Sequence, residues 1–310
     1  MVRFSLLILL APVLAVAATP PRAPGVARSG VDIETAATVY LAAELRTQVR
    51  ASLATMPEKV RQMFTQDQGS GLSVEHLDAV TAAAKRGFQI AVFEPLALRA
   101  FADNLDASSA RKSLAFFSSD LGRRMVAADV ELAGLDESTT DKIMKGDLTA
   151  PETPARDALA GQLERDTLST DSAVDIYLRI GKALAVGTAI GAGMDPIAAG
   201  DRATKIGDAS ARAELQKDLQ APLRRYIAYG YRDLSDEDLQ RFAQFLESTP
   251  GKRFVLAYNA AMDAGFDAMG RRCGERIGEA WREMAAAEAT PPPALAEPTP
   301  PVPSPTPSPR

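Results

Sequence analysis

The hydrophobic positions of this chain follow a helical period over most of its length. After Asp32, apolar side chains recur at intervals of three and four residues, which is typical of one buried face of an α-helix. The first such set is Ile33, Ala36, Ala37, Tyr40 and Leu41. The pattern predicts an all-α fold, and the abundance of small residues indicates helices that pack closely.

Turn and capping residues divide the first half of the chain. We expect the first helix to end near Met56, a short helix to run from Pro57 to Phe64, and a hinge to follow at 69–71. Proline suits the first turn of a helix, which supports this division. Ser73 is predicted to cap a long helix.

Further signals place the helices that follow. Pro95 should kink or restart the long helix, which ends near Asn104. Asp106 opens the next helix, and the helix after that continues to Gly134. The stretch 135–168 is polar and contains two prolines, so we interpret it as a joining segment.

The second half shows a similar order of elements. It is expected to begin near Ser169, with a helix from about Ser210 to Tyr231. An acidic helix start follows at 235–238, where the helix dipole favours negative charge. The last helix is predicted to extend to Trp281.

A short phrase occurs twice, 129 residues apart, in 116–125 and again in 245–254. Phenylalanine, serine, glycine and a basic pair align without gaps. The aligned residues are Phe116, Ser119, Gly122, Arg123 and Arg124 in the first copy and Phe245, Ser248, Gly251, Lys252 and Arg253 in the second. A repeat of this kind predicts two tandem copies of one helical module.

The phrase is expected to join two helices. Each serine, or the residue after it, is a good N-cap. A helical glycine is unfavourable by about 1 kcal/mol relative to alanine, so its recurrence suggests close approach by a neighbouring helix. The basic pair leaves three interpretations open: one continuous kinked helix, ion pairs with acids such as Glu247 or Asp103, or an anion held by Gly, free N–H groups and Arg.

The phrase resembles the hallmark of the DUF2059 family, exported bacterial helical proteins of unassigned function. The resemblance covers 80–150 and 205–287 best, with Tyr replaced by Phe117 and Leu246 and the proline displaced to Pro250. It implies an all-helical fold and an envelope location. It implies no catalytic residues.

The two ends of the chain have distinct compositions. Residues 1–18 combine Arg3 with a short apolar run and small residues, which predicts a signal peptide cleaved near Ala17 or Ala18 and a periplasmic or secreted protein. A linker at 19–30 precedes module one (31–150), a second linker (151–168) and module two (169–288). The tail at 289–310 is rich in proline and is expected to be disordered, either passive or a docking strip.

Few residues offer catalytic or metal chemistry. The net charge of −5 argues against nucleic acid as a partner. One histidine, His76, and one cysteine, Cys273, give no metal-ligand spacing, so we predict no metal and no cofactor. Cys273 is expected to be a buried thiol, with an intermolecular disulfide as the alternative.

Two further motifs carry weaker signals. The glycine-rich stretch 187–193 lacks the Lys-Ser/Thr of a phosphate loop, so close helix packing is the preferred interpretation. Carboxylates occur in 236–238 and at Asp129 and Glu131, and are expected on helix starts and polar faces.

These observations favour a non-catalytic protein that binds a protein partner or an envelope component. Two alternatives stay open: a carrier of a small ligand or lipid with an apolar cavity between the modules, and a hydrolase that uses two carboxylates. With a single tryptophan, Trp281, and few other aromatics, a long sugar-binding cleft is not expected.

Overall fold

A computed structural model describes residues 30–66, 73–151, 153–167, 169–203 and 209–289 of the chain. Within these residues every regular element is an α-helix, which confirms the predicted fold class. The helices are α1 (Ile33–Ala42), α2 (Leu45–Gln66), α3 (Val74–Gly87), α4 (Ile90–Asn104), α5 (Ala107–Phe117), α6 (Asp120–Ala133), α7 (Glu137–Lys145), α8 (Pro154–Asp166), α9 (Ser169–Gly191), α10 (Pro196–Ala203), α11 (Ala209–Gly230), α12 (Asp236–Glu247) and α13 (Thr249–Ala289).

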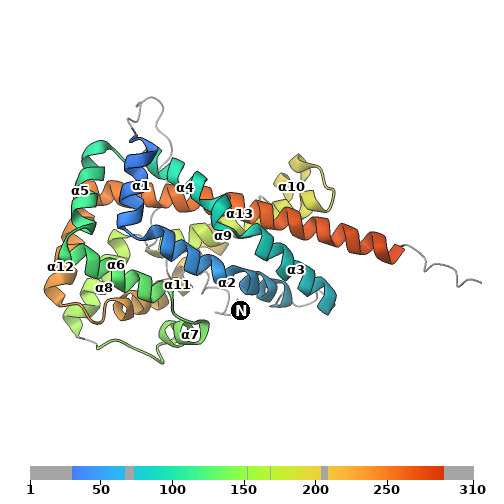
Figure 1. The fold of residues 1–310 in the computed structure, drawn as a ribbon. Helices are drawn as coiled ribbons and strands as arrows, with labels where there is room; N and C mark the ends of the chain where they lie inside the picture. The colour runs from blue at the N-terminus through green and yellow to red at the C-terminus, as the bar shows by residue number, and fades with distance from the viewer. Residues whose placement is uncertain (1–29, 67–72, 152, 168, 204–208, 290–310) are drawn as a thin grey trace, which may run out of the picture.

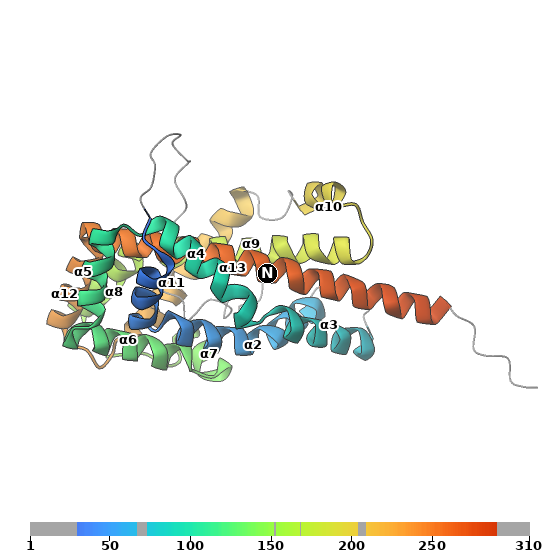
Figure 2. The ribbon, with the colours of Figure 1, turned by 45° about the horizontal axis from the view of Figure 1, so that its top comes forward.

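The molecule is organised around the last helix. α13 has 41 residues and so spans about 60 Å at 1.5 Å per residue. It crosses the whole body, with α9 along one side and α3, α4 and α5 on others (Figure 1). The rotated view separates these layers, with α10 beyond α9 and α2 beside α3 (Figure 2).

Glycines set the close approach of α9 and α13. A Cβ on Gly274 would lie 2.7 Å from the backbone N of Thr188, and one on Gly187 would lie 2.8 Å from the backbone N of Glu275. Gly191 on α9 and Gly278 on α13 face the backbone of the opposite helix in the same way. The two helices therefore run in parallel with their backbones in contact, which confirms that the 187–193 stretch serves helix packing.

One hydrophobic core extends through both halves of the chain. Edge-to-face ring pairs connect α4 to α13: Phe101 with Phe254 at 5.8 Å between centroids and Phe93 with Phe266 at 5.2 Å. Such pairs contribute about 0.5–1.5 kcal/mol beyond their area burial. The helices of the first half thus bury their apolar faces against a helix of the second half.

Several predicted helix starts are confirmed by their caps. The side chain of Ser73 accepts a hydrogen bond from His76 N, that of Asp106 from Ser108 N and Ser109 N, and that of Ser235 from Asp238 N. Each cap satisfies a backbone donor that the first helical turn leaves free.

Two predicted proline boundaries are wrong. Pro57 lies inside α2 and Pro95 inside α4, so neither starts a helix. The breaks occur instead at Glu44, whose φ of 51° is left-handed, and at Phe88, whose backbone leaves the helical region. Proline removes a single backbone donor, and tertiary packing of the apolar faces outweighs that loss here.

The interpretation of 135–168 as a joining segment is also wrong, because α7 and α8 lie within it. Both helices are mostly polar, and only a short face of each is buried. In α7 the buried residues are Thr140, Ile143 and Met144. α10 was not predicted, and α13 continues past Trp281 to Ala289.

The predicted signal peptide, the predicted 69–71 hinge and the predicted proline-rich tail from residue 290 onward lie outside the described residues. Among the helices that are described, none has the length and apolar content needed to cross a membrane.

Candidate functional site

Both copies of the repeated phrase form the same corner between two helices. Ser119 Oγ accepts from Gly122 N at 3.0 Å and donates to Phe116 O at 2.6 Å. In the second copy Ser248 Oγ accepts from Gly251 N at 3.2 Å and donates to Phe245 O. Each serine thus ends one helix and caps the next, as predicted.

The glycines of the phrase are required by the tightness of this corner. A Cβ on Gly122 would lie 2.7 Å from Phe117 Cα and close to the carbonyl oxygen of Phe116. A Cβ on Gly251 would lie 2.8 Å from Leu246 Cα. The backbone that approaches belongs to the preceding helix, so the expectation of a neighbouring helix is corrected.

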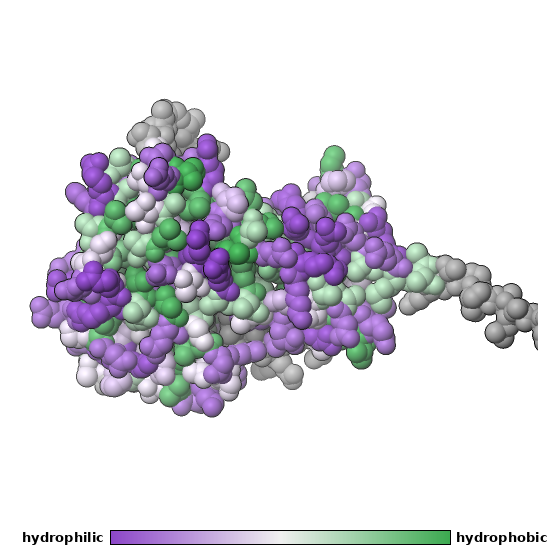
Figure 3. Space-filling model, in the orientation of Figure 1, coloured by the Kyte–Doolittle hydropathy of each residue, from purple (hydrophilic) through white to green (hydrophobic). Residues whose placement is uncertain are grey.

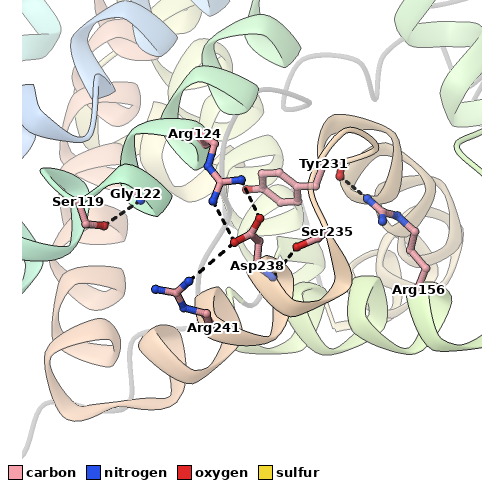
Figure 4. A network of polar contacts seen from close by, with 8 residues as sticks. All are labelled: Ser119, Gly122, Arg124, Arg156, Tyr231, Ser235, Asp238 and Arg241. Carbon is pink, nitrogen blue, oxygen red and sulfur yellow. Dashed lines mark hydrogen bonds and ion pairs between the residues drawn. The ribbon is translucent and has the colours of Figure 1, made fainter.

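The first basic pair is engaged in ion pairs (Figure 4). Arg124 donates from Nη1 to Asp238 Oδ2 at 2.7 Å and from Nη2 to Asp238 Oδ1 at 3.0 Å, which joins α6 to α12. Hydrogen bonding from Arg124 is the main cause that lowers the pKa of Asp238. Arg123 pairs with Asp120 and donates to Ser118 O.

The acids named as partners from the sequence are not the ones used. Glu247 accepts instead from Gln162 at 3.0 Å, and Asp103 pairs with Arg99. The helices at each corner are separate, so the continuous kinked helix is ruled out. Because Gly122 N is already taken by Ser119, this N–H is not open to an anion.

The two corners meet each other through equivalent residues. The rings of Phe116 and Phe245 stack with centroids 3.9 Å apart and an interplanar angle of 3°. Arg124 binds the start of α12, and Arg253 is close enough to the start of α5 to contribute, after the hydrogen bonds from Ser109, to a lowered pKa of Asp106. Reciprocal contacts of this kind are typical of a two-fold interface.

The carboxylates considered for hydrolysis do not form an open catalytic pair. Asp236 accepts from Arg156 at 3.1 Å, Glu131 accepts from Arg232 at 2.5 Å, and Asp238 is held by Arg124. Each is therefore held in an ion pair, and Figure 4 shows the one between Asp238 and Arg124.

Asp129 is buried, contrary to the expectation of a polar face. Its Oδ1 accepts from Tyr231 Oη at 2.7 Å, and burial raises the pKa of its carboxyl to about 7. Since Asp129 continues the apolar face of Met125 and Leu132, its helical position was a signal that could have predicted the burial.

An apolar cavity of about 660 Å³ lies between the end of α2 and helices α9, α10 and α13. Phe64 and Trp281 form one wall, with ring centroids 5.5 Å apart. Small residues of α9, including Gly181, Ala185 and Ala189, form the opposite wall. The sequence did not predict this cavity, because Phe64 and Trp281 lie on helices that are far apart in the chain.

The remaining candidates are structural. Cys273 is fully buried against Gly87, and burial raises the pKa of its thiol to about 12, in agreement with the buried-thiol interpretation. His76 is half-buried near the start of α3, with Nδ1 3.0 Å from Ser73 Oγ. Over the described ranges, no group of three His, Cys, Asp or Glu side chains could hold a metal ion.

Comparison of the chain with protein-family models, with curated proteins and with solved structures found no match.

Proposed function

We propose that this protein is an exported, non-catalytic helical binding protein whose apolar cavity holds a small amphiphilic ligand with an acidic head group. The observation that carries the proposal is the 660 Å³ cavity between the end of α2 and α9, α10 and α13. Its volume falls within the roughly 300–1,000 Å³ of small-molecule sites.

The chemistry of the lining supports this class of ligand. The side chains are almost all apolar, which favours an acyl chain or another apolar body. Arg202 is the one charged residue among the described lining residues, and it is exposed at the rim. A carboxylate or another anionic head at the rim would pair with it while the apolar body is buried.

The exposed surface supports a carrier over a docking protein. Large exposed hydrophobic residues are isolated from one another in the sequence: Ile33, Leu41, Val74, Leu96 and Ile197. On the face drawn in Figure 3, hydrophobic side chains are interspersed with hydrophilic ones. An extended apolar surface is the usual mark of a protein-docking face.

We also propose that the two halves arose by duplication, as the repeated phrase suggests. The identical corners at Ser119 and Ser248 and the stacking of Phe116 on Phe245 support this history. Export rests on the composition of residues 1–18.

A fluorescent polyunsaturated fatty acid tests the binding function. Titration should give saturable fluorescence enhancement at micromolar concentration. Ala189→Phe, which fills the cavity, should abolish it, while Ala198→Phe on the exposed face of α10 should not. Circular dichroism is the control that tests whether both variants are folded.

A second pair of probes tests the head group. Arg202→Gln should weaken binding of the acid about tenfold and leave the matching fatty alcohol unchanged, since only the acid uses the charge. Saturable binding that Ala189→Phe leaves intact would place the ligand elsewhere and overturn the proposal.

A further inference from the structure

A second recess, separate from the apolar cavity, lies between α8, α11 and the segment that joins α7 to α8. It has a volume of about 420 Å³ and shares no lining residue with the apolar cavity. Its charged lining residues are Arg156, Asp157, Arg224 and Arg225. Arg156 and Arg224 are each paired with a carboxylate, so Arg225 is the arginine whose charge would attract a ligand of opposite charge.

Backbone carbonyls hold two of these guanidinium groups in place. Arg224 donates from Nη2 to Asp157 O at 2.8 Å, and Arg225 donates from Nε to Met144 O at 3.1 Å. In both, the Nε and Nη2 edge is used on the protein, and Nη1 has no hydrogen-bond partner among the described residues. Each arginine therefore keeps the donors of its Nη1 group for a ligand.

Among the described lining residues of the recess, arginines outnumber carboxylates. Asp157 Oδ2 pairs with Arg224 at 2.8 Å, and Arg156 pairs with Asp236 at 3.1 Å. Arg225 has no carboxylate partner in the part of the chain that the structure describes. Its guanidinium group donates to the carbonyl oxygen of Met144. The first turn of α8, which carries Arg156 and Asp157, adds the positive end of a helix dipole.

We infer that this recess binds the phosphate group of a small phosphate ester. A tetrahedral phosphate offers enough acceptor oxygens for the Nη1 donors of both Arg224 and Arg225, and arginine is well suited to phosphate. The organic part would lie against the uncharged wall of Ala150, Pro151 and Ala221. This site is independent of the proposed acyl ligand, so either assignment can fail alone.

Isothermal titration calorimetry with inorganic phosphate and glycerol 3-phosphate tests the inference in the full-length protein. Ionic strength is matched with sodium chloride, and glycerol and acetate serve as comparison solutes. We expect both phosphates to bind at one site and the ester to bind more tightly than the free ion. Tighter binding of the free ion would assign the site to inorganic phosphate and overturn the inference that the ligand is a phosphate ester. Equal binding of acetate, or heats indistinguishable from those of chloride, would overturn the phosphate site.

One variant and a matched control locate the site. Arg225→Gln should weaken phosphate binding about tenfold or more, as expected for loss of a charge-assisted hydrogen bond. Arg272→Gln on the exposed surface of α13 makes the same change in charge outside the recess and should leave affinity unchanged. An equal loss in both variants would indicate non-specific attraction and overturn the inference.

Ala221→Glu protects the test against a folding defect in Arg225→Gln. Ala221 is exposed, so the substitution removes no buried contact, but it adds a carboxylate to the lining of the recess. It should weaken phosphate binding by a similar factor at an unchanged melting temperature. Full affinity in Ala221→Glu would contradict the assignment.

Discussion

At the scale of single residues, the buried acid Asp129 stands out because its environment opposes its charge. It has one hydrogen-bond donor, Tyr231, on the other half of the chain. Nearby Tyr226 donates to Leu132 O instead, at 2.9 Å. A buried carboxylate with so little compensation favours the protonated form.

The consequence is a stability that falls as pH rises. Burial raises the folded-state pKa of Asp129 from 3.8 to about 7, so the folded protein binds more protons than the unfolded chain between these values. The contribution of Asp129 is fully present below about pH 4, is lost as pH approaches 7, and is constant above. The difference of about three pKa units sets an upper limit of about 4 kcal/mol.

Asp129→Asn should therefore be more stable than the natural protein at pH 8, with the advantage shrinking toward pH 4. Urea unfolding across this pH range measures the difference. Asp233→Asn, which removes a carboxylate that is 82% exposed, is the control and should show no such trend. A pH-independent difference for Asp129→Asn would contradict the raised pKa.

At the scale of elements, the sequence predicted the helical class and several helix starts, but it missed α7, α8 and α10 and did not predict which helices pack together. Caps such as Ser73, Asp106 and Ser235 act within four residues, so local sequence predicts them well. Pro57 and Pro95 lie inside helices although proline disfavours a helix interior. The unfavourable effect of proline is local, whereas the tertiary packing that outweighs it involves residues far apart in the chain.

The candidate sites were predictable only in part, for the same reason. The corner at Gly122 was visible because the phrase is contiguous and repeated. The apolar cavity needs Phe64 to meet Trp281, and the arginine recess needs Arg156 on α8 to meet Arg225 on α11. No local pattern encodes which helix faces which.

The pairing of α9 with α13 yields a prediction at this scale. Gly274→Ala would place a Cβ against the backbone of Thr188, so the helices must separate. We expect a loss of about 1–3 kcal/mol in the free energy of unfolding, as for overpacking in a core. Urea unfolding measures it.

Gly181→Ala on α9 provides the matched control. No atom lies within 4 Å of its added Cβ, and alanine favours the helix, so this variant should be neutral or more stable by up to about 1 kcal/mol. Equal effects of the two substitutions on stability would mean that the close approach of α9 and α13 does not require glycine at position 274.

At the scale of the whole molecule, the two halves are joined by a shared core rather than by a small interface. Helices α3, α4 and α5 of the first half all pack on α13. Phe101 and Phe93 are buried against Phe254 and Phe266 of that helix. Phe116 of α5 and Phe245 of α12 stack on each other at one end of the molecule, where the same two helices lie side by side (Figure 1).

A chain built in this way should unfold as one unit. Residues 30–151 expressed alone would expose the faces that α13 covers, so we expect little stable helix and no cooperative melting by circular dichroism. The full chain should show a single transition, in which probes on either half coincide. A cooperative transition in the isolated 30–151 segment would instead mean that the first half closes its own core. In that case the contacts with α13 would join two independently stable modules.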